Sequence, residues 1–174
     1  MISSALIEAI LRQYRLPLHG IHGPSHWGRV LENGQRLATL TGANQKVVTL
    51  FAVFHDACRL NEDHDPQHGS RGADLSGSFR GKLFDLSDDE FVMLKVACRL
   101  HTEGLTESDV TVQTCWDADR LDLGRIGVKP HPKRLCTKTA KDFNILEWAH
   151  DRAAAGYIPV FVAQDWLKMP AKSR

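Results

Sequence analysis

The sequence lacks an excess of charge of either sign. Its 174 residues carry 22 Lys and Arg against 21 Asp and Glu, which gives a formal net charge of +1. DNA and RNA are bound by broad basic surfaces, and this balance does not supply one. We therefore expect no nucleic-acid polymer as a partner. A small anionic substrate needs only a local group of cations, so that class of ligand stays open.

Cysteine is also scarce, and long apolar runs are absent. No C-x-x-C pair occurs, and no segment approaches the roughly 20 apolar residues of a membrane span. The N-terminus has no basic region ahead of an apolar core, so it is not typical of a signal peptide. These features predict a cytoplasmic protein with no membrane partner and with reduced, buried thiols at Cys58, Cys98, Cys115 and Cys136.

Apolar residues recur at helical spacing along nearly the whole chain, and strand-like alternation is limited to "YIPVFV" at 157–162. Pro24 suits a first helical turn, Gly42 suits a C-terminal cap, and "SDDE" at 87–90 is a capping box. The prediction is one all-α domain over 1–174, a bundle of six or seven helices. They are expected at 4–14, 24–42, from 45 through "LFAVFHDACRL", and at 68–79, 87–101, 111–123 and 132–155.

Several residues of metal-ligand type lie on the apolar faces of these predicted helices. His55 shares its face with Val48 and Phe51, and Asp56 lies about 100° further round the same helix. Asp119 follows Cys115 and Trp116 at helical spacing. His26, His68 and His101 also lie on apolar faces. Any one of them alone is more simply a hydrogen-bonded core histidine or a helix cap.

The His-Asp dipeptide is weak evidence by itself, because it occurs three times. His64-Asp65 falls in a polar loop where both groups are readily solvated. His150-Asp151 lies on a partly apolar face with no second ligand nearby, so His150 is taken as a core histidine. An alternative is a small metal site in a loop, formed by His19, His22 and His26, although His26 fits the helix that follows Pro24 better.

The number of separate segments favours a metal. Five segments each place such a residue beside an apolar stripe, and unpaired polar groups in a core oppose folding. A divalent ion converts neutral imidazoles and carboxylates into bonded groups. A mixed set of two His and two Asp leaves positions for water, which suits a catalytic ion better than a structural zinc.

The order His26, His55-Asp56, Asp119 resembles the HD superfamily of metal-dependent phosphohydrolases. The supporting contexts are "HWGRV", "FHDACR" and "WDADRLD", and the last is similar to an element of the alarmone-hydrolysing stringent-response enzymes. The likeness covers about 21–125, followed by a C-terminal helix and tail at 132–174. It implies an HD-domain-like bundle and a divalent ion, with Mn, Fe, Co, Ni, Zn and Mg not distinguished.

Two more stretches, "HGSRGAD" and "RLHTEG", resemble the extra histidine positions of the two-metal branch of that superfamily. The resemblance implies that His68 and His101 bind either a second ion, bridged by Asp56, or a phosphate. One ion and two ions both stay open. An acidic pair follows the His-Asp dipeptide in the stringent-response enzymes. Glu62 and Asp63 stand several residues further on here and are candidates for the catalytic acid or base.

The implied reaction is hydrolysis of a phosphate ester or anhydride by a phosphomonoesterase or phosphodiesterase. The partner is a small phosphorylated substrate, and a nucleotide is favoured by analogy of fold alone. Candidate substrate contacts are Arg59, Arg120, Lys129 and Lys133. The alternative from another class is a regulatory domain that binds metal and nucleotide without turnover, and a plain helical scaffold is a third reading. The sequence does not indicate an oligomeric state.

Overall fold

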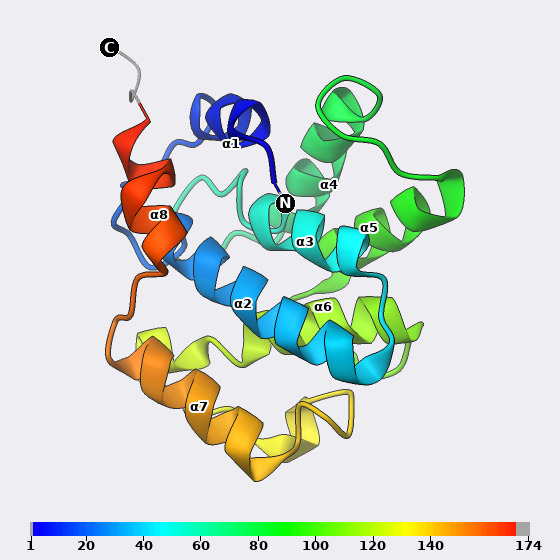
Figure 1. The fold of residues 1–174 in the computed structure, drawn as a ribbon, viewed down its shortest axis with the longest axis vertical. Coiled ribbons are helices and arrows are strands. Elements are labelled where there is room, and N and C mark those ends of the chain that lie inside the picture. Colours follow the sequence, from blue (N-terminus) through cyan, green and yellow to red (C-terminus); the bar gives the residue numbers. More distant parts are fainter. Residues whose placement is uncertain (1, 170–174) are drawn as a thin grey trace.

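The computed structural model describes residues 2–169, and this part of the chain is built from helices (Figure 1). The all-α prediction is confirmed, with eight α-helices in the described part rather than six or seven. Their bounds are α1 Ser4–Leu11, α2 Pro24–Thr41, α3 Gln45–Phe54, α4 His68–Phe79, α5 Asp88–Leu100, α6 Val110–Arg120, α7 Phe143–Ala154 and α8 Val160–Gln164. Short 3₁₀ turns occupy Leu123–Ile126, Pro132–Arg134 and Trp166–Lys168.

Local signals fix most helix ends. Pro24 stands at the first position of α2, and Gly42 ends it with a φ of 76°, a value that glycine adopts without strain. Asn44 caps α3 by accepting from the backbone N–H groups of Lys46 and Val47. At α5, Ser87 and Glu90 form the predicted capping box.

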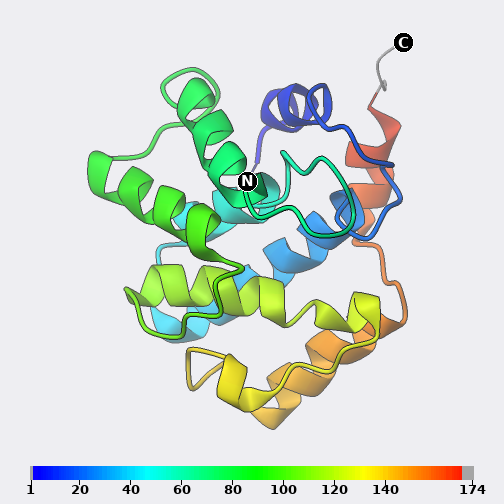
Figure 2. The ribbon, with the colours of Figure 1, turned by 180° about the vertical axis from the view of Figure 1, so that it is seen from behind.

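Helix α2 runs through the centre of the bundle and packs on α3 and α6, while α4 packs on α5 (Figures 1 and 2). The main core lies between these helices and contains the fully buried Trp27, Phe51, Phe54 and Trp116. A smaller cluster around Leu121, Leu135 and Leu146 packs α7 against the 3₁₀ turn at Leu123–Ile126. The main core therefore packs α2, α3, α4, α5 and α6 against one another.

The predicted helix over 132–155 is wrong. Only Pro132–Arg134, as a 3₁₀ turn, and Phe143–Ala154 are helical. The carboxylate of Asp117 accepts from the N–H groups of Cys136 and Thr137 at 2.6 and 2.8 Å. These hydrogen bonds hold the segment between the two helical stretches out of the helical conformation. Asp142 then starts α7 afresh by capping it.

Smaller differences occur at other ends of helices. The first helix stops at Leu11, and α6 stops at Arg120 before a separate 3₁₀ turn. The suggestion of a strand in "YIPVFV" is wrong, because Pro159 precedes the short helix α8 there. Among residues 2–169, no helix has both the length and the apolar character that crossing a bilayer requires. Residues 170–174 of the predicted C-terminal tail lie outside the described part.

Candidate metal centre

Five helices direct ligand-type side chains to one buried point. His26 lies in the first turn of α2, His55 caps the end of α3 with Asp56 next to it, and Asp119 lies in the last turn of α6. The Nε2 atoms of His26 and His55 are 3.0 Å apart. Asp119 Oδ1 lies 3.4 Å from the first and 3.8 Å from the second. The four residues of the predicted metal set therefore meet.

His68 and His101 meet at one oxygen of the Asp56 carboxylate, Oδ1. His68 begins α4 and His101 follows the last residue of α5, and their Nε2 atoms are 2.9 Å apart. Asp56 Oδ1 lies 3.1 and 3.7 Å from these two nitrogens. Its Oδ2 lies 3.4 and 3.5 Å from Nε2 of His26 and His55. Asp56 therefore stands between two histidine pairs, each close enough with Asp56 to hold an ion.

The tautomers of the four rings follow from their outer nitrogens. Nδ1 of His26 faces the Asp122 carboxylate at 2.7 Å, and Nδ1 of His55 faces the Phe51 carbonyl at 3.1 Å. Nδ1 of His68 and of His101 likewise face main-chain carbonyls, those of Asp65 and Cys98. Each Nδ1 therefore carries a proton and donates it outward. In the neutral ring, Nε2 is then the unprotonated nitrogen and turns its lone pair inward.

A divalent cation fits this arrangement. Without one, neutral imidazoles would aim lone pairs at each other across 3.0 and 2.9 Å. Asp56 Oδ1 is buried and has no hydrogen-bond partner among the described residues, although a carboxylate oxygen in a core needs one. Nitrogen and carboxylate ligands together suit Zn, Mn, Fe, Co and Ni.

The electrostatics at His55 and Asp119 point the same way. Burial lowers the pKa of His55 to about 3, against the attraction of Asp56 and Asp119, so this ring is neutral at neutral pH. Burial alone would raise the pKa of Asp119, but His55 and His26 outweigh it and lower that pKa to about 2. A neutral imidazole and an ionised carboxylate are the forms that bind metal. The Asp119 side chain is 16% exposed, whereas those of His26 and His55 are fully buried. Solvent therefore reaches the two histidines from the Asp119 side.

No protein-family model and no curated protein matches the chain. Among solved structures, the chain is similar to a predicted HD superfamily hydrolase from an uncultured Thermotogales bacterium. The superposition has a TM-score of 0.60 and 23% sequence identity and covers 87% of this chain and 85% of the other. This chain has the HD-domain fold. The fold expected from the order of the His and Asp motifs is thereby confirmed.

Two residues that support the candidate metal centre were not singled out from the sequence. Asp122 is buried and accepts from His26 Nδ1 at 2.7 Å and from Arg29 Nε at 2.7 Å and Nη2 at 3.0 Å. It thereby fixes the ring of His26. A signal was present, because Arg29 lies three residues after His26 and, on the helix predicted over 111–123, Asp122 lies three residues after Asp119. Residues three apart on a helix share a face.

The HD fold brings two of the predicted substrate or acid-base residues to the cluster. Arg59 is buried, and its Nη1 lies 3.6 Å from Asp56 Oδ1. Glu62 contacts His22, whose ring centre lies 6.3 Å from that of His26. The other Glu62 oxygen, Oε1, is buried and has no hydrogen-bond partner in the described part of the chain. Asp63 is exposed and contributes its main-chain carbonyl to Arg59 at 2.5 Å.

The remaining three candidate cations point elsewhere. The Arg120 guanidinium donates to the carbonyls of Leu105 and Arg134 at 2.7 and 2.9 Å, which accounts for its burial without any substrate. Lys129 pairs with Glu147 of α7 at 2.6 Å. Lys133 is exposed in the 3₁₀ turn Pro132–Arg134. Sequence proximity to Asp119 did not indicate where the Arg120 side chain goes, because adjacent helical residues face about 100° apart.

Proposed function

We propose that the protein is a metal-dependent phosphohydrolase that cleaves a phosphate ester or anhydride, with a nucleotide as the favoured substrate. The observation that carries this proposal is the inward orientation of four imidazole Nε2 atoms around Asp56. The similarity to a structure described as a predicted HD superfamily hydrolase supports it. The same two observations support the more general conclusion that the protein is a hydrolase with a metal site.

His26, His55, Asp56 and Asp119 would hold one ion, and Asp56, His68 and His101 would hold a second. A bound divalent ion supplies Lewis acidity, which makes water a stronger nucleophile near neutral pH and neutralises charge on a phosphoryl group. The chain's own residues prepare the site for that chemistry. Asp122 orients His26, and main-chain carbonyls orient the other three rings. Placing these groups before the substrate arrives reduces reorganisation during the reaction.

Arg59 contributes the cation that lies nearest the cluster. Its guanidinium donates to the carbonyls of Asn61 and Asp63, so its position is set by the main chain. Arginine binds phosphate oxygens through two parallel donors, and this one stands beside Asp56. Glu62, paired with His22, is the better placed of the two proposed acid-base residues, because its Oε1 atom is free to accept a proton or a hydrogen bond. The roles of Arg59 and Glu62 stay proposals.

The test combines metal analysis with turnover. Elemental analysis of the metal-replete chain should find one or two divalent ions per chain. Release of phosphate should be measured over a panel of nucleotides and a general phosphatase or phosphodiesterase reporter, with manganese added. Asp56→Asn should lower kcat by at least 100-fold, since it removes the carboxylate that both histidine pairs share. Asp151→Asn is the matched control, because Asp151 is the exposed acid of another His-Asp dipeptide.

The outcomes separate the alternatives. Stoichiometric metal together with turnover that Asp56→Asn abolishes and Asp151→Asn retains supports the enzyme. Stoichiometric metal without turnover over the whole panel refutes it in favour of a domain that binds metal and nucleotide without catalysis. A chain that takes up no metal refutes both and leaves a helical scaffold.

A further inference from the structure

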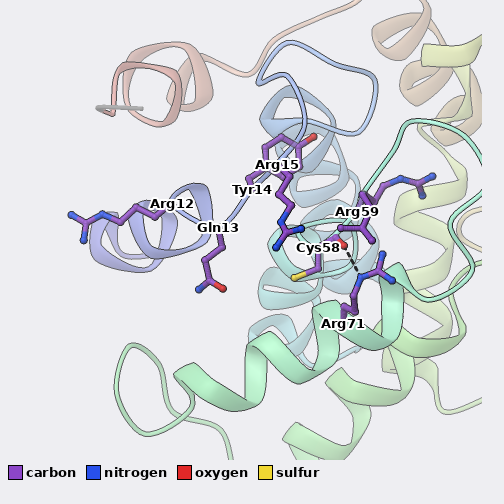
Figure 3. Close-up of a pocket in the computed structure, with 8 residues that line it drawn as sticks. Arg12, Gln13, Tyr14, Arg15, Cys58, Arg59 and Arg71 are labelled. Carbon is purple, nitrogen blue, oxygen red and sulfur yellow. Dashed lines mark hydrogen bonds between the residues drawn. The ribbon is translucent and has the colours of Figure 1, made fainter. Parts of the chain in front are cut away.

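The metal centre meets solvent on the side of Asp119, and His22 lies on the same side. Burial is the largest influence on the pKa of both residues, but the positive charge of Arg125 acts on both of them as well. The three side chains therefore lie near one another. The cavity of about 490 Å³ drawn in Figure 3 is a different place, because the Arg59 guanidinium, which lies beside Asp56, points away from it.

The loop before α2 holds His22 in place. Its turns are closed by main-chain hydrogen bonds of 2.9 and 3.1 Å, donated by the N–H groups of Gly20 and Gly23. Nε of Arg125 donates to the Ile21 carbonyl at 2.9 Å, which ties the loop to the segment that follows α6. The main chain next to His22 is therefore anchored from two directions, and the residue is only 8% exposed.

The carboxylate of Glu62 orients the His22 ring. Nδ1 of His22 contacts Oε2 of Glu62, and because a carboxylate only accepts, Nδ1 carries the proton and donates it. The other oxygen, Oε1, lies against Gly20, where a Cβ would collide with it. A glycine at this position therefore makes room for the carboxylate behind the ring. Glu62 is held between the loop and His22, with one oxygen toward each.

The opposite nitrogen of the His22 ring is an available acceptor. Nε2 makes no hydrogen bond with the described residues, and unlike Oε1 of Glu62 it is not sealed from solvent. Burial lowers the pKa of His22, against the charge of Asp56 and the contact with Glu62, so the ring is neutral at neutral pH and Nε2 keeps its lone pair. The ring centre lies 6.3 Å from that of His26. A lone pair therefore stands at the entrance, beside a proposed metal ligand.

We propose that Nε2 of His22 accepts a hydrogen bond from the water that attacks the phosphoryl group, which makes His22 a catalytic residue and Glu62 a positioning residue. This inference rests on the proposed function and deepens it. Among the reacting groups, water is the donor that a lone pair requires, since phosphoryl and ester oxygens only accept. A carboxylate behind an imidazole fixes the tautomer and the direction of the ring. Glu62 thereby acts on the reaction through His22.

The first experiment replaces His22 by Asn, whose amide nitrogen substitutes for Nδ1 while nothing substitutes for Nε2. Kinetics are measured on the manganese-loaded full chain, with a substrate of the panel that wild type hydrolyses. His22→Asn should lower kcat by about 100-fold or more and leave KM and bound metal within about threefold of wild type. His19→Asn is the matched control, because His19 is an exposed histidine of the same loop. A wild-type kcat in His22→Asn overturns the inference.

The second experiment asks whether Glu62 acts through His22 or directly on the substrate. Glu62→Gln should lower kcat about tenfold in the wild-type background and less than about twofold in the His22→Asn background, because the ring through which it acts is then missing. An equal loss in both backgrounds means that the carboxylate acts on the substrate by itself, and this result overturns the positioning role.

The third experiment needs no turnover. Nitrogen-15 NMR of the zinc-loaded full chain at neutral pH gives the tautomer of His22, with the signals assigned by their loss in His22→Asn. The ring should carry its proton on Nδ1, and a proton on Nε2 overturns the inference, since no lone pair would then face the entrance. Absence of bound metal or of phosphate release in wild type is the failure of the proposed function, and the inference falls with it. Turnover that His22→Asn retains overturns the inference alone.

Discussion

Replacement of Asp122 by Asn tests whether the residues behind the histidines tune the metal centre. Asp122 is buried and carries the charge that His26 and Arg29 both contact, at 2.7 Å each. An amide of the same shape leaves Arg29, whose side chain is only 6% exposed, without its counter-ion. Breaking a buried ion pair from one side destabilises a protein by about 3–5 kcal/mol. The same change removes the carboxylate that orients His26, which typically lowers metal affinity about 10–100-fold.

The assay measures both quantities in one set of proteins. Competition with a chromophoric chelator gives the zinc or manganese affinity, and urea unfolding gives the stability. Asp117→Asn is the control, because Asp117 is another buried acid, on α6, and accepts three hydrogen bonds from Cys136 and Thr137. It should lower stability and leave metal affinity within twofold of wild type. A wild-type metal affinity in Asp122→Asn, or an equal loss of affinity in Asp117→Asn, would refute the reasoning.

Three further predictions concern stability. Removing metal with a chelator should lower the melting temperature, because a ligand present at 100 times its Kd stabilises the folded state by about 2.7 kcal/mol. Gly72→Ala should destabilise by about 1–3 kcal/mol in urea unfolding, since a Cβ there would lie 2.1 Å from the Phe54 carbonyl oxygen. Gly77→Ala should instead stabilise α4 by roughly 0.5–1 kcal/mol, since a Cβ there would make only an ordinary contact of 3.5 Å with Phe91. Asp65→Asn should lower the melting temperature at pH 7. Burial raises the Asp65 pKa, but the Arg71 guanidinium outweighs it and lowers that pKa below its ordinary value, so the difference from wild type should shrink as the pH falls through the folded-state pKa.

Local sequence determined most helices and the identity of the residues at the centre. The capping box at Ser87 and the glycine at 42 act within one turn of their helix, so their effect can be read without knowing any other part of the chain. Helical spacing likewise placed His55 and Asp119 on core-facing stripes. The order of these residues along the chain then indicated the HD fold, which the structural similarity confirms.

Contacts between distant segments decided the rest. The segment before α7 is not helical because Asp117, about 20 residues earlier, bonds to its main chain, and no periodicity carries that information. The Arg120 side chain is likewise positioned by distant segments, because its guanidinium donates to the carbonyls of Leu105 and Arg134. Asp122 contacts His26 and Arg29 across 96 and 93 residues of sequence, respectively. Hydrophobic spacing shows which face of a helix is buried, whereas only the folded chain decides which polar atom meets which.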